Sequence, residues 1–131
     1  MVESMHAGAG VDYDVLMRAN LTEVFGERDP AKRLSAIERL YANDAVVHEP
    51  HASARGHEQI NAAVSALLSQ LPAAFVFTVR SPVLGHNGIG VLKWRSGPHD
   101  GPAAVTGMDV VHFQDGRIHS LFVFIDQPGE D

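Results

Sequence analysis

The apolar residues of this chain change their spacing at Pro72, and this change constrains the fold more than any other feature of the sequence. Before Pro72 they recur at intervals of three and four residues, which is typical of helices that bury one face. After Pro72 they alternate with polar residues or run continuously through Val, Phe and Thr, as they do in β-strands. The sequence therefore predicts a helical first half followed by a sheet.

Local signals set the bounds of these elements. Asp29-Pro30 starts a helix, because Asp caps a helix and Pro fits its first position. Asn87-Gly88 is a strong hairpin signal between two strands. Helices are predicted over residues 11–26, 30–42 and 56–71, and strands over residues 45–49, 75–84, 89–95, 103–113 and 118–126. Residues 50–55 are predicted to form a loop.

This order of elements predicts an α+β domain, with three N-terminal helices packed on one side of a curved, mostly antiparallel sheet. A length of 131 residues fits one domain. Residues 1–10 are small and polar without periodicity, so we expect a flexible tail there and a single domain over residues 11–131.

The charge balance excludes some partners. The formal net charge is −6, whereas nucleic acids and anionic membranes are bound by basic surfaces. The sequence contains no apolar run of roughly 18–20 residues, the length that a membrane span needs. It also contains no cysteine, and its first residues lack the pattern of a signal peptide. We therefore expect a cytoplasmic protein with neither nucleic acid nor membrane as a partner.

The predicted last strand is apolar on both faces over residues 121–125. The helices can cover only one face of the sheet, so the other face needs a second covering layer. A second copy of the chain is the simplest source, which predicts a homodimer through the outer face of the sheet. The alternative is a scattering of exposed apolar side chains, which is common in monomers.

Asp109 is the most informative residue, because Asp is disfavoured in the middle of a strand. Alternation places it on one face with Val105, Gly107 and Val111. In an apolar cavity, desolvation would raise the pKa of Asp109 and leave a neutral carboxyl group that donates a hydrogen bond. The alternative is a structural acid paired with a buried Arg or with backbone amides.

Two further polar residues are candidates for the same cavity. Glu49 ends a short strand just before Pro50, and a second carboxylate there could act as a general base; the alternative is an exposed loop residue. Asn20 lies four residues from both Leu16 and Val24 on the first helix, so it is either a cavity residue or a hydrogen-bonded core amide. Trp94 is expected in the core or on the cavity wall.

The eight histidines suggest a metal site only at first sight. His48 and His51 are separated by two residues, and Pro50 forbids the helix that a zinc-binding His pair of this kind requires. Of the others, His119 is the one that we expect near the pocket. No three histidines are placed to share a metal ion, so we predict no metal site.

Several short motifs, taken in order, resemble the nuclear transport factor 2-like superfamily, and within it ketosteroid isomerase and the SnoaL-like polyketide cyclases. The resemblance covers residues 12–126. The motifs are Tyr41-Ala42-Asn43-Asp44-Ala45, Glu49-Pro50, Gly56-His57-Glu58-Gln59-Ile60, His86-Asn87-Gly88, Asp109-Val110-Val111-His112-Phe113 and Asp115-Gly116-Arg117-Ile118.

The resemblance implies a conical fold, a homodimer and an apolar pocket without metal or organic cofactor. By position, Glu49 falls on the general base of ketosteroid isomerase and Asp109 on its protonated oxyanion-hole acid. Asn20 replaces the catalytic Tyr of the first helix, while Tyr41, a supporting residue, is kept. The implied pocket wall consists of Val24, Tyr41, Leu92, Trp94, Val105, Gly107, Val111, Leu121, Val123 and Ile125.

These expectations lead to a SnoaL-like protein that binds a small apolar carbonyl compound and catalyses proton transfer, as an isomerase or a cyclase. Glu49 would take the proton, and Asp109, with Asn20 as a second donor, would stabilise the oxyanion. The alternative is a non-catalytic ligand-binding or dimerisation module of the same fold. An epoxide hydrolase is less favoured, because Arg95 alternates to the face opposite Asp109.

Overall fold

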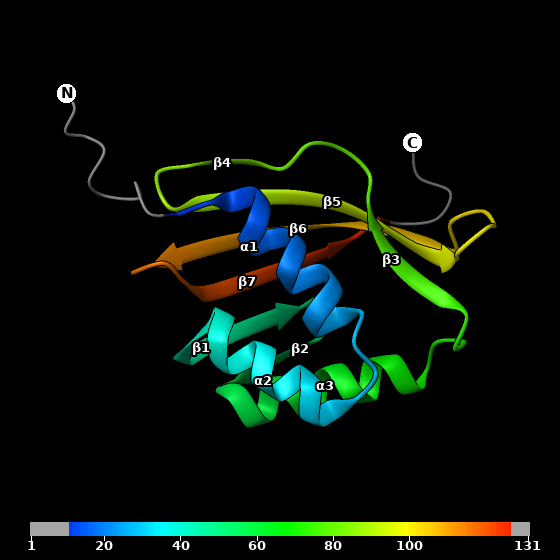
Figure 1. The fold of residues 1–131 in the computed structure, drawn as a ribbon, viewed down its shortest axis with the longest axis horizontal. Helices are drawn as coiled ribbons and strands as arrows, with labels where there is room; N and C mark the ends of the chain where they lie inside the picture. Colours follow the sequence, from blue (N-terminus) through cyan, green and yellow to red (C-terminus); the bar gives the residue numbers. More distant parts are fainter. Residues whose placement is uncertain (1–10, 127–131) are drawn as a thin grey trace.

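The computed structural model describes residues 11–126, which form three helical segments packed on one seven-stranded sheet (Figure 1). The tail predicted over residues 1–10, and residues 127–131 of the predicted domain, lie outside the described residues. The fold class predicted from the sequence is confirmed: the helices pack on a mostly antiparallel sheet.

The second helix begins where the Asp29-Pro30 signal predicts, and the first helix begins two residues later than predicted. Helix α1 (Tyr13–Ala19) continues directly into a π-helical turn, η2 (Asn20–Phe25). Helix α2 (Pro30–Leu40) is capped by Asp29, whose side chain accepts a 2.9 Å hydrogen bond from the backbone N–H of Ala31. Helix α3 (His57–Ser69) completes the set. Across residues 11–126, none of the helices combines the length and apolarity that a membrane span requires.

The sheet is mixed because its first strand pairs with its last. The strands are β1 (Tyr41–Glu49), β2 (Ala52–Arg55), β3 (Phe75–Val79), β4 (Leu84–His86), β5 (Ile89–Pro98), β6 (Val105–Gln114) and β7 (Arg117–Ile125). Their order is β2-β1-β7-β6-β5-β3, with β4 also paired to β5. The β1–β7 pair is parallel, and the other pairs among the described strands are antiparallel.

Three sequence-based bounds were wrong. Residues 50–55, predicted as a loop, contain β2, which forms a hairpin with β1. Strand β1 begins at Tyr41, because Tyr41 leaves the helical conformation and pairs with Ile118. The strand predicted over residues 75–84 is two strands, β3 and β4, since the pairing with β5 breaks between them around Pro82.

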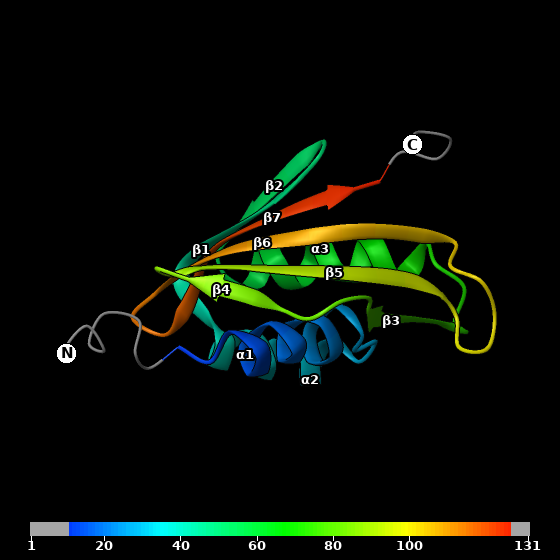
Figure 2. The ribbon, with the colours of Figure 1, turned by 90° about the horizontal axis from the view of Figure 1, so that it is seen from above.

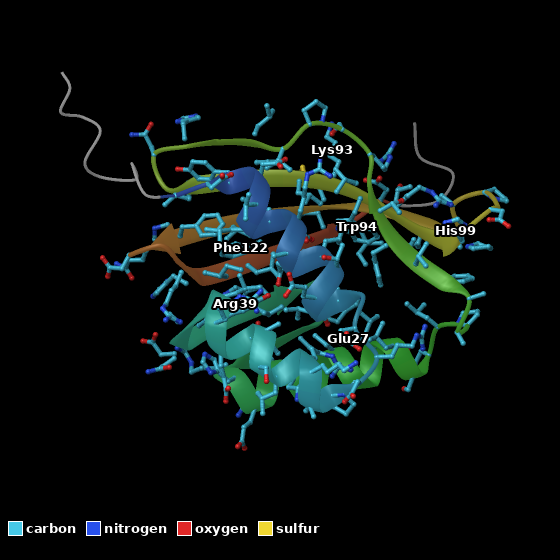
Figure 3. All side chains as sticks on the ribbon, viewed as in Figure 1. Glu27, Arg39, Lys93, Trp94, His99 and Phe122 are labelled. Atoms are coloured by element: carbon cyan, nitrogen blue, oxygen red, sulfur yellow. The ribbon has the colours of Figure 1, made fainter. Side chains whose placement is uncertain are left out.

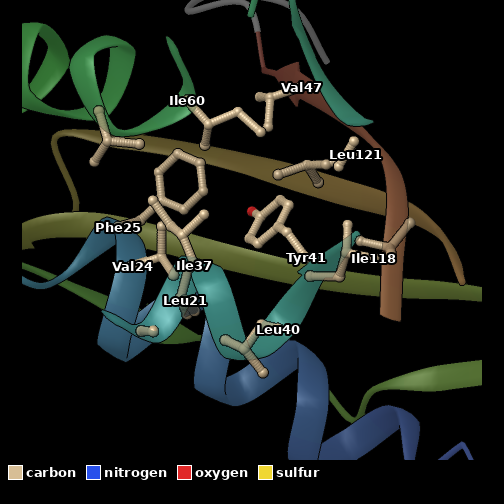
Figure 4. Packing of buried hydrophobic residues seen from close by; sticks show 14 of the residues in the cluster. Leu21, Val24, Phe25, Ile37, Leu40, Tyr41, Val47, Ile60, Ile118 and Leu121 are labelled. Carbon is tan, nitrogen blue, oxygen red and sulfur yellow. The ribbon is translucent and has the colours of Figure 1, made fainter. Parts of the chain in front are cut away.

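The core lies between the helices and the inner face of the sheet. Figure 2 shows α1 and α2 against one side of the long strands β5 and β6. In Figure 4, Tyr41 lies among apolar side chains that include Ile37, Ile118 and Leu121, and all four are fully buried. Within residues 11–126, no helix covers the outer face of β7: Phe122 and Phe124 are 41% and 51% exposed.

Candidate active site

A pocket of about 330 Å³ opens between the inner face of the sheet, η2 and the end of α3. Its size falls within the usual range for small-molecule sites. Apolar side chains make up most of the wall, and three polar residues interrupt it: Glu49, Ser96 and Asp109. The other lining residues are Leu21, Phe25, Pro50, Leu67, Leu71, Phe75, Phe77, Trp94, Ala104, Val105, Val123 and Ile125.

The strand register brings the two acids to the same face of the sheet. Asp109 on β6 pairs with Val123 on β7. On the other side of β7, Val47 pairs with Leu121 and His48 with Phe122, and this register, continued by one residue, would place Glu49 beside Val123. Two strand spacings separate the backbones of Glu49 and Asp109 by about 10 Å. A small molecule lying over Val123 would therefore contact both carboxyl groups.

Asp109 is buried, with 5% of its surface exposed. The indole N–H of Trp94 donates a 2.9 Å hydrogen bond to its Oδ1. Desolvation raises the pKa of Asp109 from 3.8 to about 7, although the Trp94 hydrogen bond opposes the shift by stabilising the charged form. Because Trp94 occupies Oδ1 as a donor, a proton on this carboxyl group resides on Oδ2, where it can be donated to a ligand.

Gly107 makes room for the indole of Trp94. The two residues pair across β5 and β6. A Cβ at position 107 would lie 2.4 Å from the Cζ2 atom of Trp94 and 2.4 Å from the carbonyl oxygen of Phe124. The ring of Phe77 packs edge-on against the indole, with centroids 5.8 Å apart. Figure 3 shows Trp94 between the first helix and β3.

Glu49 is less deeply buried than Asp109. It is the last residue of β1 and is half-buried, and Pro50 after it also lines the pocket. Burial raises the pKa of the Glu49 carboxyl above its ordinary value, but no charged neighbour adds to this shift. Of the two acids, Glu49 is thus the one with more water to stabilise its charge.

A second polar pair lies beside Asp109 in the core. The hydroxyl of Tyr41 donates a 2.5 Å hydrogen bond to Oδ1 of Asn20, and both residues are almost completely buried. Burial raises the pKa of Tyr41, the charge of Asp109 raises it further, and the Asn20 hydrogen bond lowers it. The Tyr41 hydroxyl is therefore a neutral donor whose proton is already used by Asn20.

The structure divides the predicted pocket wall into two groups. Trp94, Val105, Val123 and Ile125 line the pocket together with Glu49 and Asp109. The remaining predicted residues lie outside its lining: Val24, Tyr41, Leu92, Val111 and Leu121 belong to the packed core, Gly107 lies under Trp94, and Asn20 is bonded to Tyr41. The reason is that helix side chains fill the inner face of the sheet beyond Asp109, so the pocket occupies only one end of it.

Sequence reasoning missed part of the wall. Phe75 and Phe77 alternate along β3, and Ser96 continues the alternation of Leu92 and Trp94 along β5, so strand periodicity alone could have placed them on the inner face. No local signal shows that Leu67 on α3 and Leu71 just after it meet those strands.

The other polar candidates lie elsewhere. His119 packs against His112 with ring centroids 5.6 Å apart and does not line the pocket. Arg95 donates to the carbonyl oxygen of Gly101 at 2.9 Å and has no contact with Asp109 among the hydrogen bonds of residues 11–126. In the part of the chain that the structure describes, no three His, Asp or Glu side chains gather as metal ligands would.

A cone of three helices on a curved sheet, with a pocket at one end, defines a protein of the nuclear transport factor 2-like class. The model of the SnoaL-like domain family matches residues 19–121, and the chain belongs to this family. A comparison with curated protein sequences finds no match.

Solved structures show the same fold at low sequence identity. An isomerase candidate of the SnoaL-like family from Agrobacterium tumefaciens has a TM-score of 0.81 and 23% identity, over 88% of this chain and 97% of that one. A ketosteroid isomerase candidate from Kribbella flavida has a TM-score of 0.67 and 16% identity, over 91% and 81%. A polyketide cyclase candidate from Sinorhizobium meliloti has a TM-score of 0.65 and 17% identity, over 83% and 93%.

Proposed function

We propose that the protein binds a small apolar carbonyl compound and catalyses proton transfer at the carbon next to the carbonyl group, in an isomerisation or a cyclisation. One observation carries this proposal: two carboxyl groups, Glu49 and Asp109, interrupt the wall of an otherwise apolar pocket from the same face of the sheet. Paired acids whose surroundings differ are typical of acid–base sites.

In this proposal the two acids have different roles because they differ in burial. Glu49, at the more accessible strand end, is the ionised base that removes the proton. Asp109, buried and held by Trp94, is the neutral acid that donates a hydrogen bond through Oδ2 to the oxygen of the developing enolate. Asn20 acts indirectly: it holds Tyr41 in the core beside Asp109 rather than contacting the substrate.

Hydrogen–deuterium exchange tests this proposal without knowledge of the natural substrate. A panel of apolar ketones is incubated with the protein in D₂O, and deuterium at the carbon next to the carbonyl is followed by NMR. We expect exchange above the rate in buffer for the ketones that fit the pocket. Binding of these ketones without any added exchange would instead support a non-catalytic ligand-binding module.

We also propose a homodimer formed through the outer face of the sheet. Phe122 and Phe124 on β7 are exposed there. Val110 and Met108 lie opposite them on β6, and His48 stacks on Phe122 with ring centroids 4.7 Å apart. This apolar patch is continuous across three strands, and a two-fold axis through it would bury the patch of each copy against the other.

Replacing Phe124 with lysine should convert the dimer to a monomer, because the change places a charge in the middle of this patch. Light scattering coupled to size exclusion measures the mass directly. Val15→Lys is the matched control, since Val15 is 58% exposed on α1, which packs on the opposite face of the sheet, and should leave the dimer intact. A wild-type protein of monomer mass at tens of micromolar would contradict the proposal.

A further inference from the structure

Ser96 carries a buried hydroxyl that is unpaired in the described part of the chain. Its exposed fraction is 1%, and its Oγ has no hydrogen-bond partner within residues 11–126. Burying a hydroxyl without a partner costs free energy, and such groups are uncommon in native proteins. The position therefore calls for an explanation that packing alone does not supply.

The strand register places Ser96 on the wall of the pocket. It pairs with Phe77 on β3 and Val105 on β6, and both of these residues line the pocket, as Ser96 does. Trp94 precedes it by two residues on the same strand and therefore lies on the same face. Ser96 is the third polar residue of the wall besides the two acids.

Ser96 and Asp109 lie on opposite sides of Trp94 along the sheet, because the Ser96–Val105 and Leu92–Asp109 pairs flank the Trp94–Gly107 pair. Asp109 is opposite Leu92, four residues before Ser96 on β5, so roughly 13 Å of strand separates the two positions. The indole N–H points to Asp109, and the ring crosses β6 at Gly107. A ligand that lies across Trp94 with its carbonyl oxygen at Asp109 would therefore extend toward Ser96.

We propose that Ser96 determines specificity, by hydrogen-bonding a second polar group at the far end of an elongated apolar carbonyl compound. The substrate class is then a flat or ring-containing ketone with a hydroxyl or carbonyl group opposite the reacting end. A serine hydroxyl both donates and accepts, so it suits either group. This inference rests on the proposed function, because that function places the reacting carbonyl at Asp109.

Two ketones that differ by one hydroxyl test this assignment: 4-(4-hydroxyphenyl)butan-2-one and 4-phenylbutan-2-one. Trp94 is the one tryptophan of the chain, so its fluorescence reports binding of either ketone without any turnover. We expect the wild-type protein to bind the hydroxylated ketone about tenfold more tightly, because a hydrogen bond to a buried hydroxyl contributes about that gain in affinity. Ser96→Ala should abolish this preference and leave the affinity for 4-phenylbutan-2-one unchanged.

Thermal unfolding separates this role from a structural one. Because Oγ has no partner in the unliganded protein, Ser96→Ala should keep or raise the melting temperature, whereas loss of a structural hydrogen bond would lower it. Ser53→Ala, at an exposed serine of β2, is the control and should retain the tenfold preference.

The outcomes distinguish this inference from the function on which it rests. Equal affinities for the two ketones in the wild type, or the same preference in Ser96→Ala, would overturn the role of Ser96 while leaving proton transfer intact. A tenfold preference without hydrogen–deuterium exchange would uphold Ser96 as the recognition residue and contradict the proposed proton transfer. If neither ketone quenched the Trp94 fluorescence at millimolar concentration, the role of Ser96 and the proposed function would both be contradicted.

Discussion

Replacing Asp109 with leucine lowers the rate of hydrogen–deuterium exchange into a bound ketone by about 100- to 1,000-fold, the usual effect of removing one oxyanion-stabilising donor. Leucine branches at Cγ as aspartate does and is apolar like the surrounding wall, so the fold should persist. Rates are measured by NMR at saturating ketone, which separates the loss of rate from a loss of binding.

Asp100→Leu is the control for this substitution, because Asp100 lies on an exposed loop and, among residues 11–126, its carboxylate bonds only to His99. It should exchange ketone protons at the wild-type rate. If Asp109→Leu also retained the wild-type rate, Asp109 would be a structural acid and the proposed mechanism would be wrong.

Replacing Asp109 with asparagine should stabilise the protein at pH 8 by about 4 kcal/mol and change little at pH 3.5. The folded-state pKa of about 7 lies above the ordinary value of 3.8, so the folded protein binds the extra proton between these values. The contribution of Asp109 to the free energy of unfolding is therefore fully present below pH 4, and it is lost as the pH rises to about 7. Asparagine keeps the acceptor for Trp94 but carries no charge to desolvate.

Urea unfolding of both proteins between pH 3.5 and 8, at one fixed protein concentration, gives the difference directly. Titrating groups common to both proteins cancel in this difference, including Glu49, whose raised pKa has the same sign of effect. A difference that stays constant with pH, or falls as the pH rises, would show that Asp109 is ionised with an ordinary pKa in the folded protein.

The order of helices and strands could be predicted from the sequence, and so could the position of Asp109 and Glu49 on the inner face of the sheet. Both depend on local patterns. The change of period at Pro72 separates helices from strands, and alternation along β6 places Asp109 on the inner face. The family model and the similar structures agree with the fold that these patterns and the motifs indicated.

The extent of the pocket could not be predicted, because it depends on which side chains fill the space between layers. Leu92, Val111 and Leu121 share the inner face with Trp94, Asp109 and Val123, and periodicity cannot tell the two groups apart. They differ because the first group is buried in the packed core with helix residues such as Met17 and Val24, whereas the second group lines the pocket. The Trp94–Asp109 hydrogen bond likewise depends on Gly107, since any larger residue there would collide with the indole.

The carboxyl ¹³C NMR titration of Asp109 and Glu49 tests the central claim most directly, which is that one pocket holds a neutral acid and an ionised base. Resonances are assigned with Asp109→Asn and Glu49→Gln. We expect the Asp109 carboxyl to remain protonated at pH 6 and to titrate near pH 7, and the proposed role of Glu49 as base requires that it be ionised while Asp109 is protonated. An Asp109 carboxyl that is already ionised at pH 5 would contradict the claim, because it could not donate a proton to an enolate.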